Sequence, residues 1–147
     1  MNYTLIQDEF IMAHKVFISY DHSEDAHYKY LLQAWSNHPR FVFEFDNRSV
    51  QTAINSEDAS RVKAGISSKM KDATHLFVIV GKLSHESDWM NWEIARAKEL
   101  GLKIAAVKIE KSNISPTGLL NIKTSWATSF TQARVIEALD NAVVGYE

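Results

Sequence analysis

The sequence contains no cysteine, and its 147 residues include only two prolines and five glycines. Without cysteine there can be no disulfide, no thiol catalysis and no thiolate metal site. The few glycines leave little material for a phosphate-binding loop, and no Walker loop, GxGxxG or GxSxG motif is present. The six histidines show no paired spacing typical of metal ligands. The sequence therefore predicts neither a bound metal nor a resident cofactor.

Long hydrophobic runs and a strong excess of either charge are also absent. The longest apolar runs, such as FVIV at 77–80, are far too short to cross a bilayer. Sixteen Lys and Arg residues face eighteen Asp and Glu, and no basic run occurs. The first residues, MNYTLIQDEFIMA, lack the basic segment of a secretory signal. We therefore expect a cytoplasmic protein without a nucleic-acid or membrane partner.

The composition is that of a globular protein, with 46% hydrophobic and 11% aromatic residues. The length suits one domain of ordinary size and is too short for two. We expect a single domain over residues 1–147, in which residues 1–13 form an extension before the first strand.

Segments with strand and helix patterns alternate along the chain. Short apolar, β-rich segments predict strands at 15–20, 41–45, 75–80, 103–109 and 122–127. Helical spacing predicts helices from Ser23, a candidate N-cap, to Pro39, and at about 56–71, 88–100 and 131–143. The buried faces of the first and last helices are expected to include Leu31 and Val143, respectively. This alternation predicts an α/β fold with a doubly wound, mostly parallel five-stranded sheet.

In such a sheet, ligands bind beyond the carboxyl ends of the strands, where the strand order reverses. The segments that follow the first three predicted strands are 21–23, 46–49 and 81–93. A helix that follows a strand also begins at this edge, so Glu93, one turn into its helix, is expected on the ligand side.

The segment SDWMNWEI at 87–94 surrounds Glu93 with two tryptophans, and two readings of it stay open. Burial against Trp89 and Trp92 could raise the pKa of Glu93, or Glu93 could stay ionised and stabilise positive charge. Alternatively, Glu93 is an ordinary acid near a helix N-terminus, and the tryptophans are core residues.

The two polar loops before this segment carry further candidates. Arg48 could bind a ligand phosphate or pair locally with Asp46. Asp21 and His22 are interpreted as plain loop residues.

Three segments together resemble one family. FISYDHSED at 17–25 resembles the first motif of Toll/interleukin-1 receptor (TIR) domains, and FDNRSV at 45–50 resembles the second-strand exit of bacterial TIR-like domains. SDWMNWEIARAKELGLKI at 87–104 resembles the third segment of that bacterial subfamily. The whole pattern is similar to the TIR-like subunits of Thoeris anti-phage systems.

The resemblance implies a flavodoxin-like fold and cleavage of the nicotinamide–ribose bond of NAD, with NAD as a substrate rather than a cofactor. Glu93 matches the catalytic glutamate of the family. Matching positions suggest lining residues at Tyr20, Asp46, Arg48, Ser49 and Trp89. The implied product is a cyclic or conjugated ADP-ribose signal that a partner effector protein reads. The resemblance also implies a phage-derived trigger and self-association.

Two other functions are compatible with the sequence. One is a non-catalytic TIR-type interaction module, in which Glu93 is a helix acid and the tryptophans are core or interface residues. The other is an enzyme that acts on the N-glycosyl bond of a nucleoside or nucleotide other than NAD.

Overall fold

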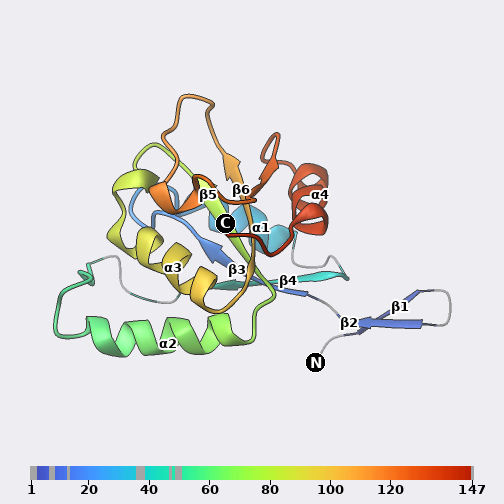
Figure 1. The fold of residues 1–147 in the computed structure, drawn as a ribbon, viewed down its shortest axis with the longest axis horizontal. Coiled ribbons are helices and arrows are strands. Elements are labelled where there is room, and N and C mark those ends of the chain that lie inside the picture. Colours follow the sequence, from blue (N-terminus) through green and yellow to red (C-terminus); the bar gives the residue numbers. More distant parts are fainter. Residues whose placement is uncertain are drawn as a thin grey trace.

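A parallel sheet of five strands forms the centre of the computed structural model, which describes residues 3–6, 9–12, 14–35, 39–46, 48 and 51–146 (Figure 1). Its spatial order is β4 (Phe41–Phe45), β3 (His14–Ser19), β5 (His75–Val80), β6 (Lys103–Lys108) and β7 (Ser125–Ala127). β3 lies between β4 and β5, so the strand order reverses at β3. This flavodoxin-like topology confirms the predicted fold class and fixes where a ligand crevice can form.

Helices cover both faces of the sheet (Figure 1). The helices α1 (His27–Ala34) and α4 (Gln132–Asn141) contribute to one hydrophobic layer, and α2 (Ala59–Lys71) and α3 (Asp88–Glu99) contribute to the other. Successive strand residues alternate between these layers, because side chains on a strand point to opposite faces. The β5 sequence HLFVIV is buried at every position, which explains its continuous apolar run.

Both ends of α3 are fixed by local sequence. The Ser87 hydroxyl accepts a hydrogen bond of 3.2 Å from the Met90 N–H and so caps the N-terminus. Gly101 has a φ of 72° immediately after the C-cap, a left-handed conformation that glycine adopts at little cost. These caps set which residues of α3 face the sheet.

The N-terminal boundary of α1 differs from the prediction. This helix begins after Ala26, because Ser23 belongs to a turn in which its N–H and hydroxyl both donate to Asp21 Oδ1. The buried face also differs from the prediction, because Leu31 is 45% exposed while Leu32 is fully buried. His38, predicted to lie at the helix end, is outside the described residues.

The C-terminal elements are also shorter than predicted. α4 ends at Asn141, so Val143 lies beyond the helix and is exposed rather than buried. β7 begins at Ser125, three residues later than expected, because only Ser125–Ala127 pairs with β6. Two short 3₁₀ helices, at Ser84–Glu86 and Thr117–Leu119, were not predicted.

The N-terminal extension contains a hairpin that the sequence analysis missed. β1 (Tyr3–Ile6) pairs antiparallel with β2 (Glu9–Met12), and the hairpin lies apart from the five-stranded sheet (Figure 1). No helix among the described residues is long and apolar enough to cross a membrane.

Candidate functional site

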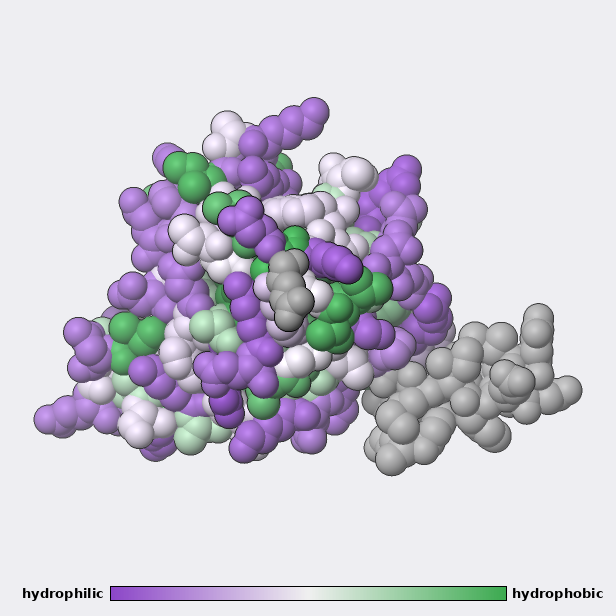
Figure 2. Space-filling view, in the orientation of Figure 1, coloured by the Kyte–Doolittle hydropathy of each residue, from purple (hydrophilic) through white to green (hydrophobic). Residues whose placement is uncertain are grey.

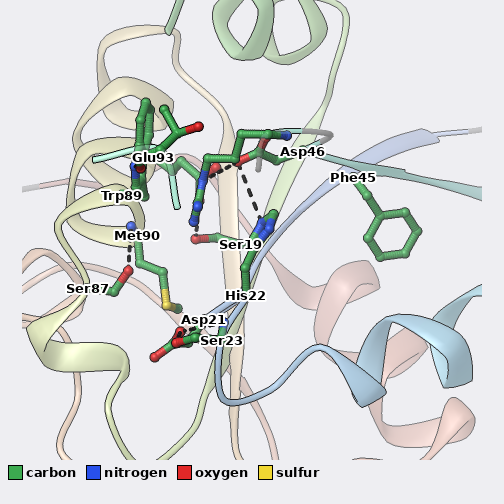
Figure 3. Close-up of polar contacts among 12 residues, drawn as sticks. Ser19, Asp21, His22, Ser23, Phe45, Asp46, Ser87, Trp89, Met90 and Glu93 are labelled. Carbon is green, nitrogen blue, oxygen red and sulfur yellow. Dashed lines mark hydrogen bonds and ion pairs between the residues drawn. The ribbon is translucent and has the colours of Figure 1, made fainter. Parts of the chain in front are cut away.

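Glu93 and Ser19 meet at the carboxyl end of β3, where the strand order reverses. The Ser19 hydroxyl donates a hydrogen bond of 2.8 Å to Glu93 Oε1. Figure 3 shows Glu93 and Trp89 on α3 close to Ser19 and His22, whereas Phe45 points away from them. Glu93 is only 1% exposed, so its carboxyl group is enclosed by protein.

Strand alternation explains why Ser19 faces Glu93. Phe17 lies in the layer of α2 and α3, and Ser19, two residues later, falls on the same face at the strand end. On α3, Trp89 and Glu93 are one turn apart and both are buried. The helix and strand thus bring a hydroxyl and a carboxyl together inside an otherwise apolar layer.

The environment of Glu93 favours its neutral form. Burial, assisted by the negative charge of Asp46, raises the Glu93 pKa to about 8, although the Ser19 hydrogen bond and the Arg48 charge act in the opposite direction. Oε2 is buried without a hydrogen-bond partner among the described residues. The first open reading is therefore the one the structure supports: Glu93 is a buried carboxyl with a perturbed pKa, and not a solvated helix acid.

Asp46 and Arg48 lie close enough to this carboxyl group to shift its pKa, and His22 contacts Asp46. Arg48 Nε lies 2.9 Å from Asp46 Oδ2, and the backbone N–H of Arg48 donates to Asp46 Oδ1 at 2.7 Å. His22 Nε2 lies 3.6 Å from the same Oδ2. Burial and the Arg48 charge lower the His22 pKa to about 4, so the histidine is neutral at pH 7. The raised pKa of Glu93 thus favours its protonated form beside the Asp46–Arg48 pair.

Trp89 belongs to the hydrophobic core and also to the wall of the site. Its indole N–H donates to Thr52 O at 2.7 Å, and the Arg48 guanidinium lies 5.1 Å from the ring centre. Trp92 packs edge-to-face against Trp89 with ring centres 6.0 Å apart. Trp89 thus fixes the loop before α2 through its hydrogen bond to Thr52, and its ring packs against the Arg48 guanidinium.

The two remaining predicted lining residues are Tyr20 and Ser49. Tyr20 faces the layer of α1 and α4, and it stacks on His22 with ring centres 4.3 Å apart. Burial raises the Tyr20 pKa to about 12, so its hydroxyl stays protonated. Ser49 lies outside the described residues.

An open cavity of about 390 Å³ lies beside this cluster, between the end of β4 and α2. We call it the α2 cavity, and its lining residues are Asp46, Arg48, Thr52, Asp58, Arg61, Val62, Gly65, Ile66 and Lys69. Asp46 and Arg48 belong both to the cavity wall and to the cluster around Glu93. Glu93 itself does not line the cavity.

Sequence reasoning missed several members of the site. Ser19 gave no signal beyond its place at a strand end, and His22 was interpreted as a plain loop residue. Asp25, in the loop after β3, is 5% exposed, and burial raises its pKa to about 6. Its carboxyl packs against Gly81, where an added Cβ would lie 2.0 Å from Asp25 Oδ2. The only available signal for Asp25 was its position in the FISYDHSED segment.

Comparison with known families agrees with this geometry. The model of the family "Thoeris protein ThsB, TIR-like domain" matches residues 17–114. The chain belongs to this family. The match includes the end of β3 with Ser19, the residues that follow β4, and α3 with Glu93. No curated protein sequence matches the chain.

Solved structures share the fold at low sequence identity. A 2-desoxiribosyltransferase from Leishmania mexicana is 12% identical, with a TM-score of 0.62 over 87% of this chain and 98% of that chain. A 2-deoxyribosyltransferase from Bacillus psychrosaccharolyticus is 15% identical, with a TM-score of 0.57 over 84% of this chain and 90% of that chain. A conserved protein from Enterococcus faecalis V583 is 10% identical, with a TM-score of 0.54 over 88% of this chain and 76% of that chain. At these identities the similarity establishes the fold alone.

The described residues contain no group of three or more His, Asp or Glu side chains placed to hold a metal ion. The chemistry available here is that of a buried carboxyl, a neutral imidazole and an arginine–carboxylate pair.

Proposed function

We propose that this member of the Thoeris TIR-like family cleaves the nicotinamide–ribose bond of NAD and makes a cyclic or conjugated ADP-ribose signal. The observation that carries the proposal is the buried Glu93 carboxyl at the point where the strand order reverses, with its pKa raised to about 8. A solvated helix acid would have neither property. Glu93 is the catalytic residue in this proposal.

The substrate itself supplies the charge that activates Glu93. The nicotinamide ring of NAD is a cation, and a nearby cation favours the ionised form of a carboxyl group. Binding therefore lowers the Glu93 pKa, so the carboxyl group releases its proton to solvent as the substrate enters and a carboxylate lies beside the reacting sugar. When the C1′–N bond breaks, its electron pair goes to the ring nitrogen, and nicotinamide leaves as a neutral molecule.

The carboxylate then stabilises the positive charge that develops on the ribose. An oxygen or nitrogen of the ADP portion, held close to C1′, forms the new bond and loses its proton if one is present. Exclusion of water from the buried site favours this cyclisation over hydrolysis. Because Glu93 is 1% exposed, substrate must displace neighbouring side chains to reach it.

The roles of the surrounding residues follow from their positions. Asp46 and Arg48 separate Glu93 from the α2 cavity, so we propose that they contact substrate when the site opens. Trp89 supports Arg48, and Tyr20 acts through His22. Ser49 follows in the same loop and is proposed as a lining residue on the family resemblance alone. A phage-derived trigger, self-association and an effector protein that reads the nucleotide complete the proposed pathway.

Nucleotide profiling of cells tests this proposal. Cells expressing wild type, Glu93→Gln or Glu99→Gln are compared with and without phage challenge. Glu99 lies on the same helix but is exposed and paired with Arg96, which makes it a matched control. We expect an ADP-ribose derivative with wild type and Glu99→Gln and its absence with Glu93→Gln.

Two results would contradict this function. Matching profiles from the three folded proteins would favour the non-catalytic interaction module. Loss of a different nucleoside or nucleotide, with NAD unchanged, would favour another N-glycosyl substrate. Figure 2 shows small hydrophobic patches divided by polar surface on the viewed face. This face offers no large apolar interface of the kind an interaction module would use.

A further inference from the structure

Gly65 lies in the middle of α2, and no neighbouring atom requires a glycine at this position. A glycine inside a helix costs stability relative to alanine, because it loses more backbone freedom on folding. Its backbone has no positive φ, and a Cβ added at Gly65 would meet no atom within 4 Å. Gly81, in contrast, has a neighbouring carboxyl where its Cβ would be.

The open space at Gly65 belongs to the α2 cavity. Gly65 lines this cavity together with Val62 and Ile66, one turn or one residue away on the same helix. These three positions form a strip of the cavity wall, and at Gly65 no side chain covers the helix backbone. Such a strip suits a planar ring that approaches the backbone closely, which is one of the uses of glycine.

Cations border the same cavity. Arg48, Arg61 and Lys69 line it, against the two acids Asp46 and Asp58. Lys69 Nζ carries three N–H donors and gives one of them to Phe45 O at 2.6 Å. Arg61 is 78% exposed and its distance to Asp58 is 3.8 Å, so this pair gives way readily to a stronger anion.

The strip can take the planar base of a nucleotide, and the neighbouring cations can take its phosphates. The position of Glu93 decides which end of a dinucleotide lies in the cavity. We propose that the α2 cavity binds the adenosine diphosphate portion of the substrate; this inference rests on the proposed cleavage of NAD. Glu93 must face the nicotinamide ribose, and it lies outside the cavity beyond Asp46 and Arg48. The diphosphate then lies beside Arg48 at the border, and the adenine lies on the strip formed by Val62, Gly65 and Ile66. The cavity volume of about 390 Å³ is within the range of ligand pockets.

Direct binding of ADP tests this inference without any need for catalysis. Isothermal titration calorimetry compares ADP, adenosine and pyrophosphate on the whole chain as wild type, Glu93→Gln, Gly65→Leu and Ala64→Leu. Ala64 is exposed on α2 and does not line the cavity, so Ala64→Leu adds similar bulk outside it. Because nothing lies within 4 Å of the Gly65 Cβ position, Gly65→Leu should fold, and a thermal melt checks this.

We expect ADP to bind wild type, Glu93→Gln and Ala64→Leu with equal affinity and Gly65→Leu at least about ten-fold more weakly. Adenosine and pyrophosphate should each bind more weakly than ADP, because each makes only part of the contacts. Equal ADP affinity for folded Gly65→Leu and wild type would overturn the inference, as would no ADP binding by wild type. Pyrophosphate binding as tight as ADP would show an anion site without the base. A change of oligomeric state in Gly65→Leu without a change in ADP affinity would assign the strip to a contact between copies of this chain.

NAD cleavage by the same four proteins separates this inference from the proposed function. If ADP binds as expected but no variant consumes NAD under phage challenge, the cavity assignment stands and the proposed reaction fails. If wild type consumes NAD and Gly65→Leu does so with unchanged KM, the reaction stands and the cavity assignment fails.

Discussion

Ser19 and Glu93, 74 residues apart in the chain, share a buried hydrogen bond of 2.8 Å at the carboxyl end of β3. This hydrogen bond joins the strand to the helix that carries the proposed catalytic group. The ionisation of Glu93 therefore depends on a small number of named neighbours, and each can be changed separately.

Glu93→Gln should alter how stability depends on pH. Burial raises the Glu93 pKa from an ordinary 4.5 to about 8, so between these values the folded protein holds a proton that the unfolded chain has lost. The wild-type free energy of unfolding should therefore fall as pH rises through this interval, by on the order of a few kcal/mol. Glu93→Gln lacks this dependence. Urea unfolding of both proteins at about pH 5 and about pH 9 measures the difference.

The comparison with Glu93→Gln also separates the pH dependence of stability due to Glu93 from that due to the histidines. Burial lowers the pKa values of His22 and His75 to about 4, so their contribution to stability is lost as pH falls from 6.5 towards 4, in the opposite direction. Both histidines remain in the variant and cancel in the difference. A difference between the two proteins that does not change with pH would contradict a raised Glu93 pKa.

Ser19→Ala should raise the Glu93 pKa further. The Ser19 hydroxyl donates to Glu93 Oε1 and so stabilises the ionised form, and its removal favours the neutral acid. The pH dependence of kcat/KM, which reports the free enzyme, should shift to higher pH by about one unit. The control Ser23→Ala removes an exposed serine whose hydroxyl donates to Asp21, and it should leave the profile in place. A downward shift with Ser19→Ala would show that the hydroxyl does not stabilise the carboxylate.

Arg48→Met should destabilise the protein by about 3–5 kcal/mol, because the buried carboxyl group of Asp46 would lose its cation. Combining it with Asp46→Asn removes both charges and should recover much of the loss. A double-mutant cycle by denaturant unfolding gives the coupling energy. Additive effects of the two substitutions would mean that the ion pair at 2.9 Å contributes little.

Gly65→Ala should stabilise the protein, whereas Gly101→Ala should destabilise it. Gly65 has a helical backbone with open space at its Cβ, so alanine should add about 0.5–1 kcal/mol. Gly101 has a φ of 72°, where a Cβ costs about 1–2 kcal/mol. Thermal unfolding should show the two melting temperatures moving in opposite directions by a few degrees. A lower melting temperature for Gly65→Ala would mean that the site tolerates no side chain even in the free protein.

Gly81→Ala should destabilise the protein by about 1–3 kcal/mol, since the new methyl group would lie 2.0 Å from Asp25 Oδ2. In an Asp25→Ala background the same substitution should cost less, because the colliding carboxyl is gone. Chemical denaturation of the four proteins measures this coupling. An equal cost of Gly81→Ala in both backgrounds would show that another neighbour is responsible.

The sequence predicts the sheet well because its strands carry strong local patterns. The predicted strand at 75–80 is an uninterrupted apolar run, and the structure places it in the middle of the sheet as β5. The ends of helices are less predictable, because competing side-chain hydrogen bonds decide them. Ser23 is a good N-cap by type, yet its hydroxyl binds Asp21 and the helix begins four residues later.

The candidate site likewise contains residues that a local pattern reveals and residues that only the packed structure reveals. Glu93 could be found because it stands in a local motif at a predictable edge of the fold. Ser19 could not, since its contact with Glu93 depends on the exact register of β3 against a helix that comes much later in the chain. The burial that raises the Glu93 pKa is likewise a property of packed neighbours, which no local pattern specifies.

The enclosure of Glu93 has a consequence for measured affinities. A ligand that must touch this carboxyl binds only the fraction of molecules in which the covering side chains have moved, and its apparent dissociation constant rises in inverse proportion to that fraction. A ligand that fits the open α2 cavity bears no such penalty. The two halves of the substrate should therefore differ in how much of its affinity they keep. A fragment with the adenosine diphosphate end should lose little affinity, and one with only the nicotinamide riboside end should lose most of it.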